Sequence, residues 1–145
     1  MERILAKSNP EETLEEHIKN VCNIWTQLKQ RYDKVINDED FWKYSFFSIV
    51  FHDFGKASVN FQNIIKREGL DLENFRHELL SGVYYYFLNS EDALDNNLSI
   101  IAIFSHHKKL DLELFKDDYN KTLKLKKEYL DQISSFIFEE IQKYK

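Results

Sequence analysis

The residues of this sequence best suited to chemistry are concentrated in one apolar stretch, IVFHDFGKAS, residues 49–58. His52 and Asp53 stand side by side there between apolar neighbours, and Lys56 follows one helical turn after Asp53. A buried carboxylate or imidazole needs a partner, because an unpaired charge in apolar surroundings is costly. The stretch therefore predicts that His52 and Asp53 pair with other side chains or bind a metal ion.

All five histidines of the chain lie in, or at the end of, predominantly apolar helical patterns: His17, His52, His77, His106 and His107. A single His on such a face is usually a core residue with one hydrogen bond, and a lone His-Asp dipeptide is weak evidence of function. Five together, one beside an Asp and two in tandem, favour a metal site. Neutral imidazole and carboxylate suit a divalent transition metal.

Helical periodicity of apolar residues accounts for most of the chain and predicts the elements that must position these groups. The first helix is expected to open near residue 8, with Asn9 as its cap and Pro10 in its first turn, and to turn His17 and Leu28 inward. Further helices are predicted over 40–52, around 61–65 and ending before Gly69, over 73–89, over 96–109, and in a last amphipathic segment that includes 123–141. Residues 111–121 are typical of a loop or a broken helix.

Composition supports one helical domain. The 145 residues include only 3 Gly and 1 Pro, so tight turns between many strands are not expected. We predict an all-α, compact bundle of about six helices, with residues 1–145 forming a single domain.

The other bulk properties set limits on function. Cys22 is the sole cysteine, which excludes a disulfide framework and a cysteine-based zinc site and suggests a reducing, cytoplasmic setting. The apolar runs are too short to span a bilayer, so no membrane association is expected. The net charge of -5 gives no whole-protein attraction to nucleic acid, which would have to bind through local patches or a partner.

The order of the motifs resembles a known family. His17, then HDFGK (52–56), RHE (76–78) and SHH (105–107) resemble the HD superfamily of metal-dependent phosphohydrolases. More narrowly, ILAKS, LEEH, FHDFGKASVNFQ, FRHELLSG and IFSHH are similar to the HD nuclease domain of the CRISPR-associated helicase-nuclease of type I systems. The resemblance runs from about Ile4 to His107, and the motifs are specific jointly rather than singly.

The resemblance implies a site with one or two divalent metal ions, drawn from Mn, Ni, Co, Fe or Mg. His17, His52 and Asp53 would hold the first ion, and the second would be held by Asp53 with His77, His106 and His107. Asp53 would then bridge the two ions and be central to catalysis. A pair of ions can activate a water, neutralise a phosphate and assist the leaving oxygen in phosphodiester hydrolysis. Lys56 would hold a phosphate or stabilise the leaving group, with an ordinary surface lysine as its alternative.

The chain departs from the family pattern in one respect. The family has a further Asp, well downstream of the tandem histidines, that completes the first metal site, and here only about a quarter of the chain follows His107. Candidates are Asp111, Asp117, Asp118 and Asp131, none of which lies in a matching motif. The chain is therefore either truncated at its C-terminus or a compact variant, and we expect the first metal site to be the weaker one.

Three further positions have both structural and functional interpretations. Gly55 either lets a neighbouring helix or substrate approach or marks a helix break. Arg76 either contacts a phosphate or pairs with Glu78. Residues 84–86, three consecutive tyrosines, offer a surface on which bases stack or simply pack in the core.

The function implied is that of a metal-dependent nuclease, a hydrolase acting on phosphodiester bonds of single-stranded nucleic acid in CRISPR interference. DNA is the expected substrate and RNA the alternative. Its implied partners are a CRISPR-associated helicase domain or subunit and, through it, the RNA-guided surveillance complex. Two other functions stay open: an HD phosphohydrolase with a closed pocket for nucleotides, and an interaction module with little or no catalysis.

Overall fold

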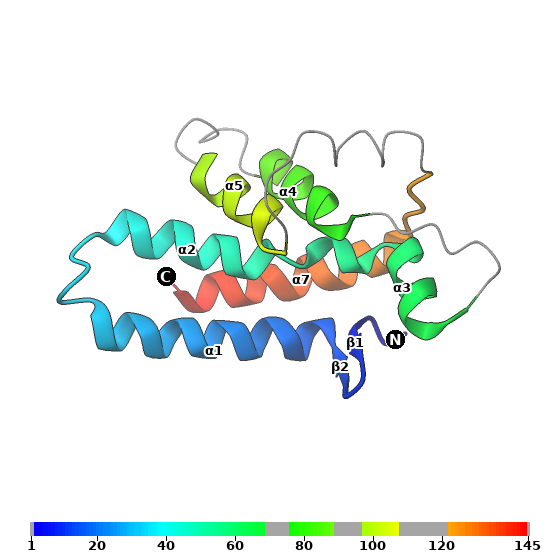
Figure 1. Cartoon of the computed structure of the whole chain (residues 1–145), viewed down its shortest axis with the longest axis horizontal. Coiled ribbons are helices and arrows are strands. Elements are labelled where there is room, and N and C mark those ends of the chain that lie inside the picture. The colour runs from blue at the N-terminus through cyan, green and yellow to red at the C-terminus, as the bar shows by residue number, and fades with distance from the viewer. Residues whose placement is uncertain (1, 69–75, 89–96, 108–121, 145) are drawn as a thin grey trace.

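The computed structural model describes residues 2–68, 76–88, 97–107 and 122–144, and these ranges form a helical bundle (Figure 1). They contain β1 (Leu5–Ser8), β2 (Glu11–Thr13), α1 (Leu14–Tyr32), α2 (Glu39–Phe51), the 3-10 helix η1 (Phe54–Ala57), α3 (Val59–Lys66), α4 (His77–Leu88), α5 (Asn97–Ser105) and α7 (Lys127–Tyr144). The predicted all-α bundle of about six helices is confirmed, with one small two-stranded sheet added. None of the helices in these ranges combines the length and apolar character needed to cross a membrane.

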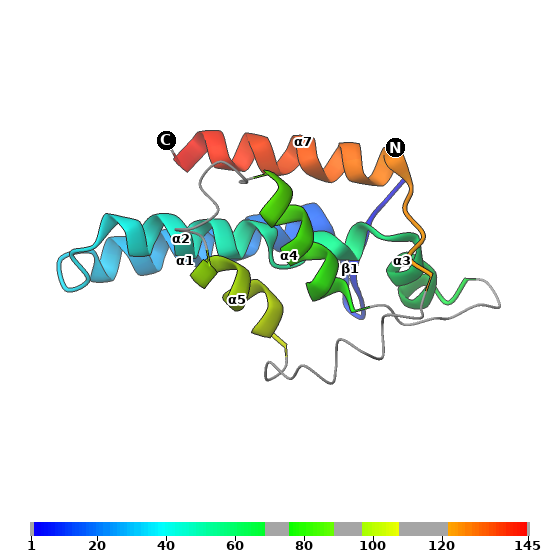
Figure 2. The ribbon, with the colours of Figure 1, turned by 90° about the horizontal axis from the view of Figure 1, so that it is seen from above.

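Helix α2 is the centre of the bundle, as its nearly uniform apolar sequence predicts. It contacts α1, α4, α5 and α7, and Trp42, Phe46 and Val50 are buried along it. Figure 1 shows α1, α2 and α7 running lengthwise, with α2 antiparallel to the other two, and Figure 2 shows α4 and α5 crossing on one side of them. The end of α2 that carries His52 and Asp53 therefore lies among the ends of other helices.

The N-terminus differs from the prediction. Residues 5–13 form an antiparallel hairpin, and α1 begins only at Leu14, with Thr13 rather than Asn9 as its cap. Thr13 and Glu16 form a reciprocal capping box, which satisfies two backbone N–H groups at the helix start. The buried Gln62 side chain also bonds to both the N–H and the carbonyl of Leu5, each at 2.9 Å. These bonds favour an extended chain where local spacing had predicted helix.

Two other details of the helix predictions were wrong. Leu28 is 46% exposed, because the buried stripe of α1 runs through Leu14, Ile18, Cys22 and Trp25, and Leu28 lies on the flank of that stripe. Leu123 precedes α7, which starts at Lys127. The prediction of a loop or broken helix at 111–121 falls outside the described residues.

Candidate metal centre

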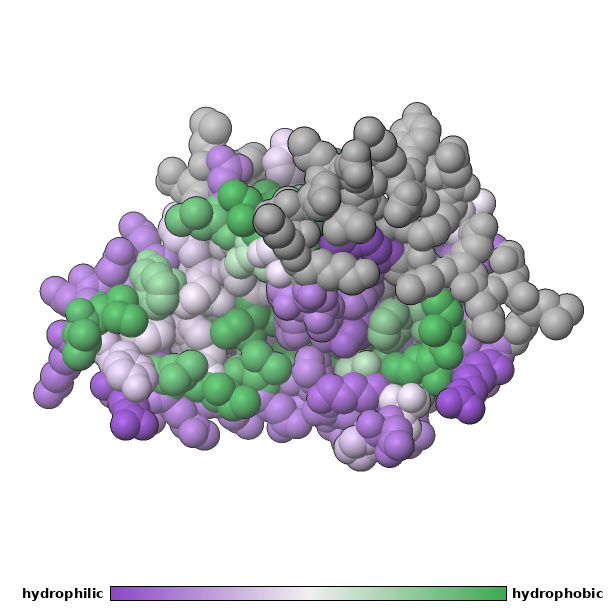
Figure 3. All heavy atoms as spheres, in the orientation of Figure 1, coloured by the Kyte–Doolittle hydropathy of each residue, from purple (hydrophilic) through white to green (hydrophobic). Residues whose placement is uncertain are grey.

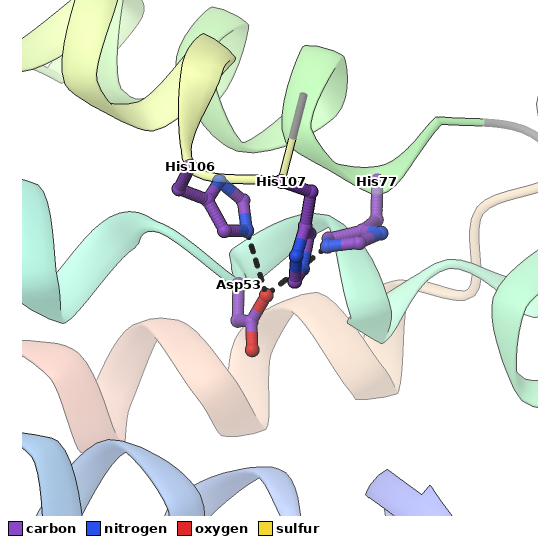
Figure 4. Close-up of side chains that lie close together, drawn as sticks. All are labelled: Asp53, His77, His106 and His107. Carbon is purple, nitrogen blue, oxygen red and sulfur yellow. Dashed lines mark ion pairs between the residues drawn. The ribbon is translucent and has the colours of Figure 1, made fainter. Parts of the chain in front are cut away.

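The five histidines and Asp53 come from four separate helices whose ends meet. His52 follows the last residue of α2 and Asp53 follows His52, while His17 lies in the first turns of α1. His77 opens α4, and His106 and His107 follow the end of α5. Figure 4 shows His77, His106 and His107 gathered over the Asp53 carboxylate. Asp53 itself is buried, with 1% of its surface exposed.

The two oxygens of Asp53 face different histidines. Oδ1 lies 3.1 Å from Nε2 of His77 and 3.3 Å from Nε2 of His106. Oδ2 lies 3.1 Å from Nε2 of His17 and 3.2 Å from Nε2 of His52. Potential ligand atoms accordingly form two groups that share Asp53: one adds His17 and His52, and the other adds His77, His106 and His107. The resemblance to the HD family assigns the same residues to two metal ions.

The other ring nitrogen of four histidines faces an acceptor. Nδ1 of His52 lies 2.6 Å from the carbonyl of Ile49, and Nδ1 of His106 lies 2.6 Å from the carbonyl of Ile103. Nδ1 of His17 lies 3.2 Å from Glu12 Oε2, and Nδ1 of His77 lies 3.5 Å from Glu78 Oε2.

A carbonyl only accepts hydrogen bonds, so Nδ1 of His52 and of His106 must carry the proton. In the neutral rings the lone pair is then on Nε2, on the side that faces Asp53. Each of the two ligand groups thus contains one histidine backed by a carboxylate and one backed by a main-chain carbonyl.

The charges of the centre are strongly coupled. Burial alone would raise the pKa of Asp53, but the contacts with His106, His17, His52 and His77 outweigh it and hold that pKa far below its usual range. Burial likewise opposes charge on His106, but Asp53 and the Ile103 carbonyl raise its pKa. For His107, burial and the neighbouring His106 and His77 lower the pKa. Asp53 therefore stays ionised at any ordinary pH.

The residues fit a bound divalent cation. Nε2 of His77, Nε2 of His106 and Oδ1 of Asp53 are buried, yet none has a hydrogen-bond partner of regular geometry. Buried polar atoms without a partner are rare and call for an explanation, such as an ion. Two ligand atoms about 2.1 Å from one metal and at right angles would be about 3 Å apart, close to the separations seen around Asp53. The donor set of imidazoles around one shared carboxylate also suits a transition metal.

Lys56 is not a surface lysine. It is 6% exposed, and its Nζ lies 2.7 Å from Oδ2 of Asp53. The 3-10 helix η1 places this ammonium one turn beyond the carboxylate, on the same side. The ammonium therefore shares Oδ2 with His17 and His52 and brings Asp53 a positive charge that does not depend on a histidine proton.

Hydrogen bonds and close packing hold α4 against η1. The Gly55 N–H donates to Ser81 Oγ at 2.8 Å, and Ser81 Oγ donates to the His77 carbonyl at 2.9 Å. The rings of Phe54 and Tyr84 stack with centroids 3.7 Å apart. A Cβ placed on Gly55 would stand 1.9 Å from the His77 carbonyl oxygen, so Gly55 is needed for the close approach.

Replacing Gly55 by Ala should therefore disrupt the protein more than replacing Gly82, which also lies in tight surroundings. At Gly55 the new methyl group meets backbone, whereas at Gly82 it meets the side chain of Phe104, which can move. We expect Gly55→Ala to lower the free energy of unfolding by about 3 kcal/mol or more, the upper part of the range for overpacking. Denaturant unfolding of both variants checks this, and an equal or smaller cost at Gly55 would contradict it.

The contacts of Arg76 and of the three consecutive tyrosines favour their structural interpretations. Nε of Arg76 lies 2.8 Å from Glu78 Oε1, so Arg76 pairs with Glu78. Tyr85 is fully buried and Tyr84 stacks on Phe54, so both pack in the core, while Tyr86 is 49% exposed. A shared stacking surface for bases is not formed by these three residues.

Two acidic residues that the sequence motifs did not single out, Glu12 and Glu78, stand behind His17 and His77. The Glu12 carboxylate contacts His17, the Lys7 ammonium at 2.7 Å and the Asn20 side-chain amide at 2.9 Å. The hydrogen bond from Lys7 is the main reason that the pKa of Glu12 falls to about 2. Glu78 is 3% exposed and stands behind His77. Glu78 could have been suspected from its place in RHE, but Glu12 reaches His17 only because residues 5–13 form a hairpin.

Glu12→Gln should weaken metal binding by the group that contains His17. A carboxylate behind a metal-binding imidazole fixes the ring and raises its basicity, and its loss typically costs about 10- to 100-fold in metal affinity. The matched control is Glu11→Gln, which removes the same charge from an exposed neighbour that pairs with Arg3. Titration calorimetry with Mn²⁺ compares the two, and equal effects would reduce the role of Glu12 to long-range charge.

The extra Asp of the first metal site has no counterpart among the described residues. Asp131 is exposed on α7 and belongs to neither ligand group. Asp111, Asp117 and Asp118 lie outside the described residues.

A helical bundle whose helix ends bring a His-Asp pair together with further histidines is the arrangement of an HD domain, and comparisons with known proteins agree. The chain is 32% identical over 118 residues to the CRISPR-associated endonuclease Cas3-HD of Methanocaldococcus jannaschii, covering 72% of this chain and 48% of that protein. It is 29% identical over 110 residues to the protein of the same name from Pyrococcus furiosus, covering 66% of this chain and 46% of that protein. No protein family model matches the chain.

The fold is also shared with a solved structure. The CRISPR-associated Cas3 HD domain protein from Methanocaldococcus jannaschii superposes with a TM-score of 0.71 at 23% identity, covering 98% of this chain and 87% of that one. These similarities identify the chain as an HD domain related to the Cas3-HD proteins of CRISPR systems. The chain spans about half the length of the curated relatives it matches.

Proposed function

We propose that the chain is a metal-dependent nuclease domain that hydrolyses phosphodiester bonds of single-stranded nucleic acid, with DNA as its substrate, in CRISPR interference. The observation that carries the proposal is the Asp53 carboxylate, which lies within 3.3 Å of four imidazole nitrogens and the Lys56 ammonium. The names of the two curated relatives, both CRISPR-associated endonucleases, support the same reaction class.

In this proposal Asp53 would belong to the ligand sets of both metal ions. His17 and His52 complete one set of ligands, and His77, His106 and His107 complete the other. Divalent metal ions, when bound, would polarise the scissile phosphate and make a water molecule more acidic. The carbonyls of Ile49 and Ile103 keep two of the imidazoles in the tautomer that ligates through Nε2.

We assign Lys56 the role of stabilising negative charge on the reacting phosphate. Its ammonium is buried beside Asp53, and a fixed positive charge in a site of low water content stabilises developing negative charge better than one in solution. His107 is the most exposed of the six metal-site residues. This exposure favours a polymeric strand over a nucleotide enclosed in a pocket.

The proposed setting is the cytoplasm, with a CRISPR-associated helicase domain or subunit that supplies single strands to the centre. Through that helicase the chain would act with the RNA-guided surveillance complex. The net charge of -5 is unfavourable for binding an intact duplex, so delivery of a single strand by a partner is consistent with the charge.

Purified chain with added Mn²⁺ should cleave a single-stranded DNA oligonucleotide at least about 10-fold faster than the same sequence in a blunt duplex, and cleavage should fall with rising salt. A panel of nucleoside mono- and triphosphates serves as the comparison, and chelator is the negative control. Faster turnover of nucleotides would favour the phosphohydrolase alternative. Absence of hydrolysis of every substrate, with any added metal, would favour an interaction module.

A further inference from the structure

A pocket of about 230 Å³ opens directly beside the candidate metal centre. It lies between α1, α2 and α5 and is lined by Val21, Ser48, Ile49, His52, Ala102 and His106. Two of these residues, His52 and His106, also contact Asp53, with their rings edge to face and centroids 5.1 Å apart. Because the two imidazoles form one wall of the pocket, a molecule that fills it would be next to the reacting group.

The lining of the pocket is mostly apolar, and its polar side-chain atoms already face other groups of the protein. Val21, Ile49 and Ala102 contribute only carbon atoms, and the Ser48 hydroxyl donates to the Tyr44 carbonyl at 2.8 Å. The Nδ1 atoms of His52 and His106 donate to main-chain carbonyls, and their Nε2 atoms face Asp53. The rings therefore present mainly carbon edges and faces to the pocket, which suits a flat, uncharged group rather than an ion.

Apolar surface continues from the pocket along α1. Val21 belongs to a stripe that begins at His17 and extends through Ile24 and Leu28, which are 56% and 46% exposed. Figure 3 shows this apolar area over α1 beside the hydrophilic residues in the middle of the same face. The pocket shares His52 and His106 with the centre and Val21 with the stripe, so it lies between the two.

We propose that this pocket binds one nucleobase of the substrate strand, on the nucleotide next to the phosphate that is cleaved. The inference rests on the proposed nuclease function and adds how the strand is held. Contact between bases and apolar or aromatic surfaces is tolerant of sequence, because every base has a π-face, and it requires a base that is not paired or stacked in a duplex. Because the polar side-chain atoms of its lining already bond to main-chain carbonyls or face Asp53, the pocket would admit any of the bases and would disfavour an intact duplex.

The inference predicts that removal of one base has an effect at one position only. Homothymidine oligonucleotides, each with a single abasic residue at a different position, are cleaved by the full chain with Mn²⁺, and products are mapped at nucleotide resolution. Cleavage should fall by about 5- to 100-fold at the phosphate that stands at one fixed offset from the abasic residue. Replacing that thymine by another base should change the rate by less than about 3-fold. Cleavage that is indifferent to the abasic position would overturn the inference.

A matched pair of variants places the effect in the pocket. Ala102→Phe fills the pocket, whereas Ile101→Phe adds a similar ring to an exposed neighbour that does not line it. Ala102→Phe should lower cleavage of the intact strand to the level of the abasic strand and abolish the difference between them, while Ile101→Phe should keep that difference. A preserved difference in Ala102→Phe would overturn the assignment to this pocket.

A substrate without a base separates this inference from the proposed function. Methyl p-nitrophenyl phosphate is a phosphodiester that has no nucleobase, and its metal-dependent hydrolysis reports only on the centre. Hydrolysis of this diester together with cleavage that ignores abasic residues would leave the nuclease proposal standing and overturn the base pocket alone. If neither this diester nor the oligonucleotides are hydrolysed, the nuclease proposal and the base pocket are both overturned.

Discussion

Replacing Asp53 by Ala is expected to reduce phosphodiester hydrolysis to the uncatalysed level, a loss of at least about 10³-fold. The reason is the division of its carboxylate: Oδ1 faces His77 and His106, and Oδ2 faces His17, His52 and Lys56. Loss of this one side chain therefore disturbs both candidate ligand groups at once. Steady-state cleavage of a fluorescent single-stranded oligonucleotide, with Mn²⁺ in excess, measures the effect.

The control for this prediction is the fold. Asp53→Ala leaves the buried Lys56 ammonium without its carboxylate, and breaking a buried pair costs about 3–5 kcal/mol. The Asp53→Ala/Lys56→Met double variant removes both partners and should recover part of that stability without recovering activity. Far-ultraviolet circular dichroism should keep its helical signal in both. Full activity in a folded Asp53→Ala protein would end the model of a shared carboxylate.

Lys56→Met should separate metal binding from turnover. The ammonium lies 2.7 Å from Oδ2 of Asp53, the oxygen that the His17 group also faces, so its removal leaves that oxygen freer for a metal ion. Metal affinity should be unchanged or higher, while kcat should fall by about 10²- to 10³-fold, the scale for losing a fixed charge that stabilises the transition state. Titration calorimetry and steady-state kinetics on the same preparation test both halves of the prediction.

Lys66→Met is the matched control for Lys56. Both ammonium groups lie over an aromatic ring, Phe61 for Lys56 and Tyr129 for Lys66, and both pair with a carboxylate, but Lys66 pairs with Glu2 rather than with Asp53. Lys66→Met should leave kcat within about 2-fold of the wild type, since surface pairs contribute little. A parallel loss of metal binding and kcat in Lys56→Met would assign Lys56 a structural role instead.

The sequence indicates the residues of the candidate centre better than their arrangement. His52, Asp53 and Lys56 are neighbours in one motif, and the resemblance of the ordered motifs to the HD family points to the other histidines. Which oxygen of Asp53 faces which imidazole depends on how four helices pack, and no local pattern encodes it. The burial of Lys56 likewise follows from the contacts of η1 with α3 and α4.

The N-terminal hairpin illustrates the same limit. Asn9 and Pro10 are good residues for a helix start, yet the capping box at Thr13 and the bonds from Gln62 to Leu5 determine the extended path. Gln62 is 57 residues away from Leu5 in the sequence, so single-sequence periodicity does not detect the contact. Because the hairpin carries Glu12 to His17, the same missed contact concealed a residue that stands directly behind the candidate centre.

Isothermal titration calorimetry of the wild type and of Asp53→Ala with Mn²⁺, at one pH, tests whether Asp53 is shared by two metal ions. We expect two Mn²⁺ ions per wild-type chain, with the site of His17 weaker than the site of His77, and no tight ion in Asp53→Ala. His17→Ala should remove only the weaker ion, and Asp131→Ala, an exposed carboxylate outside both groups, should change neither. One tight Mn²⁺ retained in a folded Asp53→Ala protein would show that the two metal ions do not share this carboxylate.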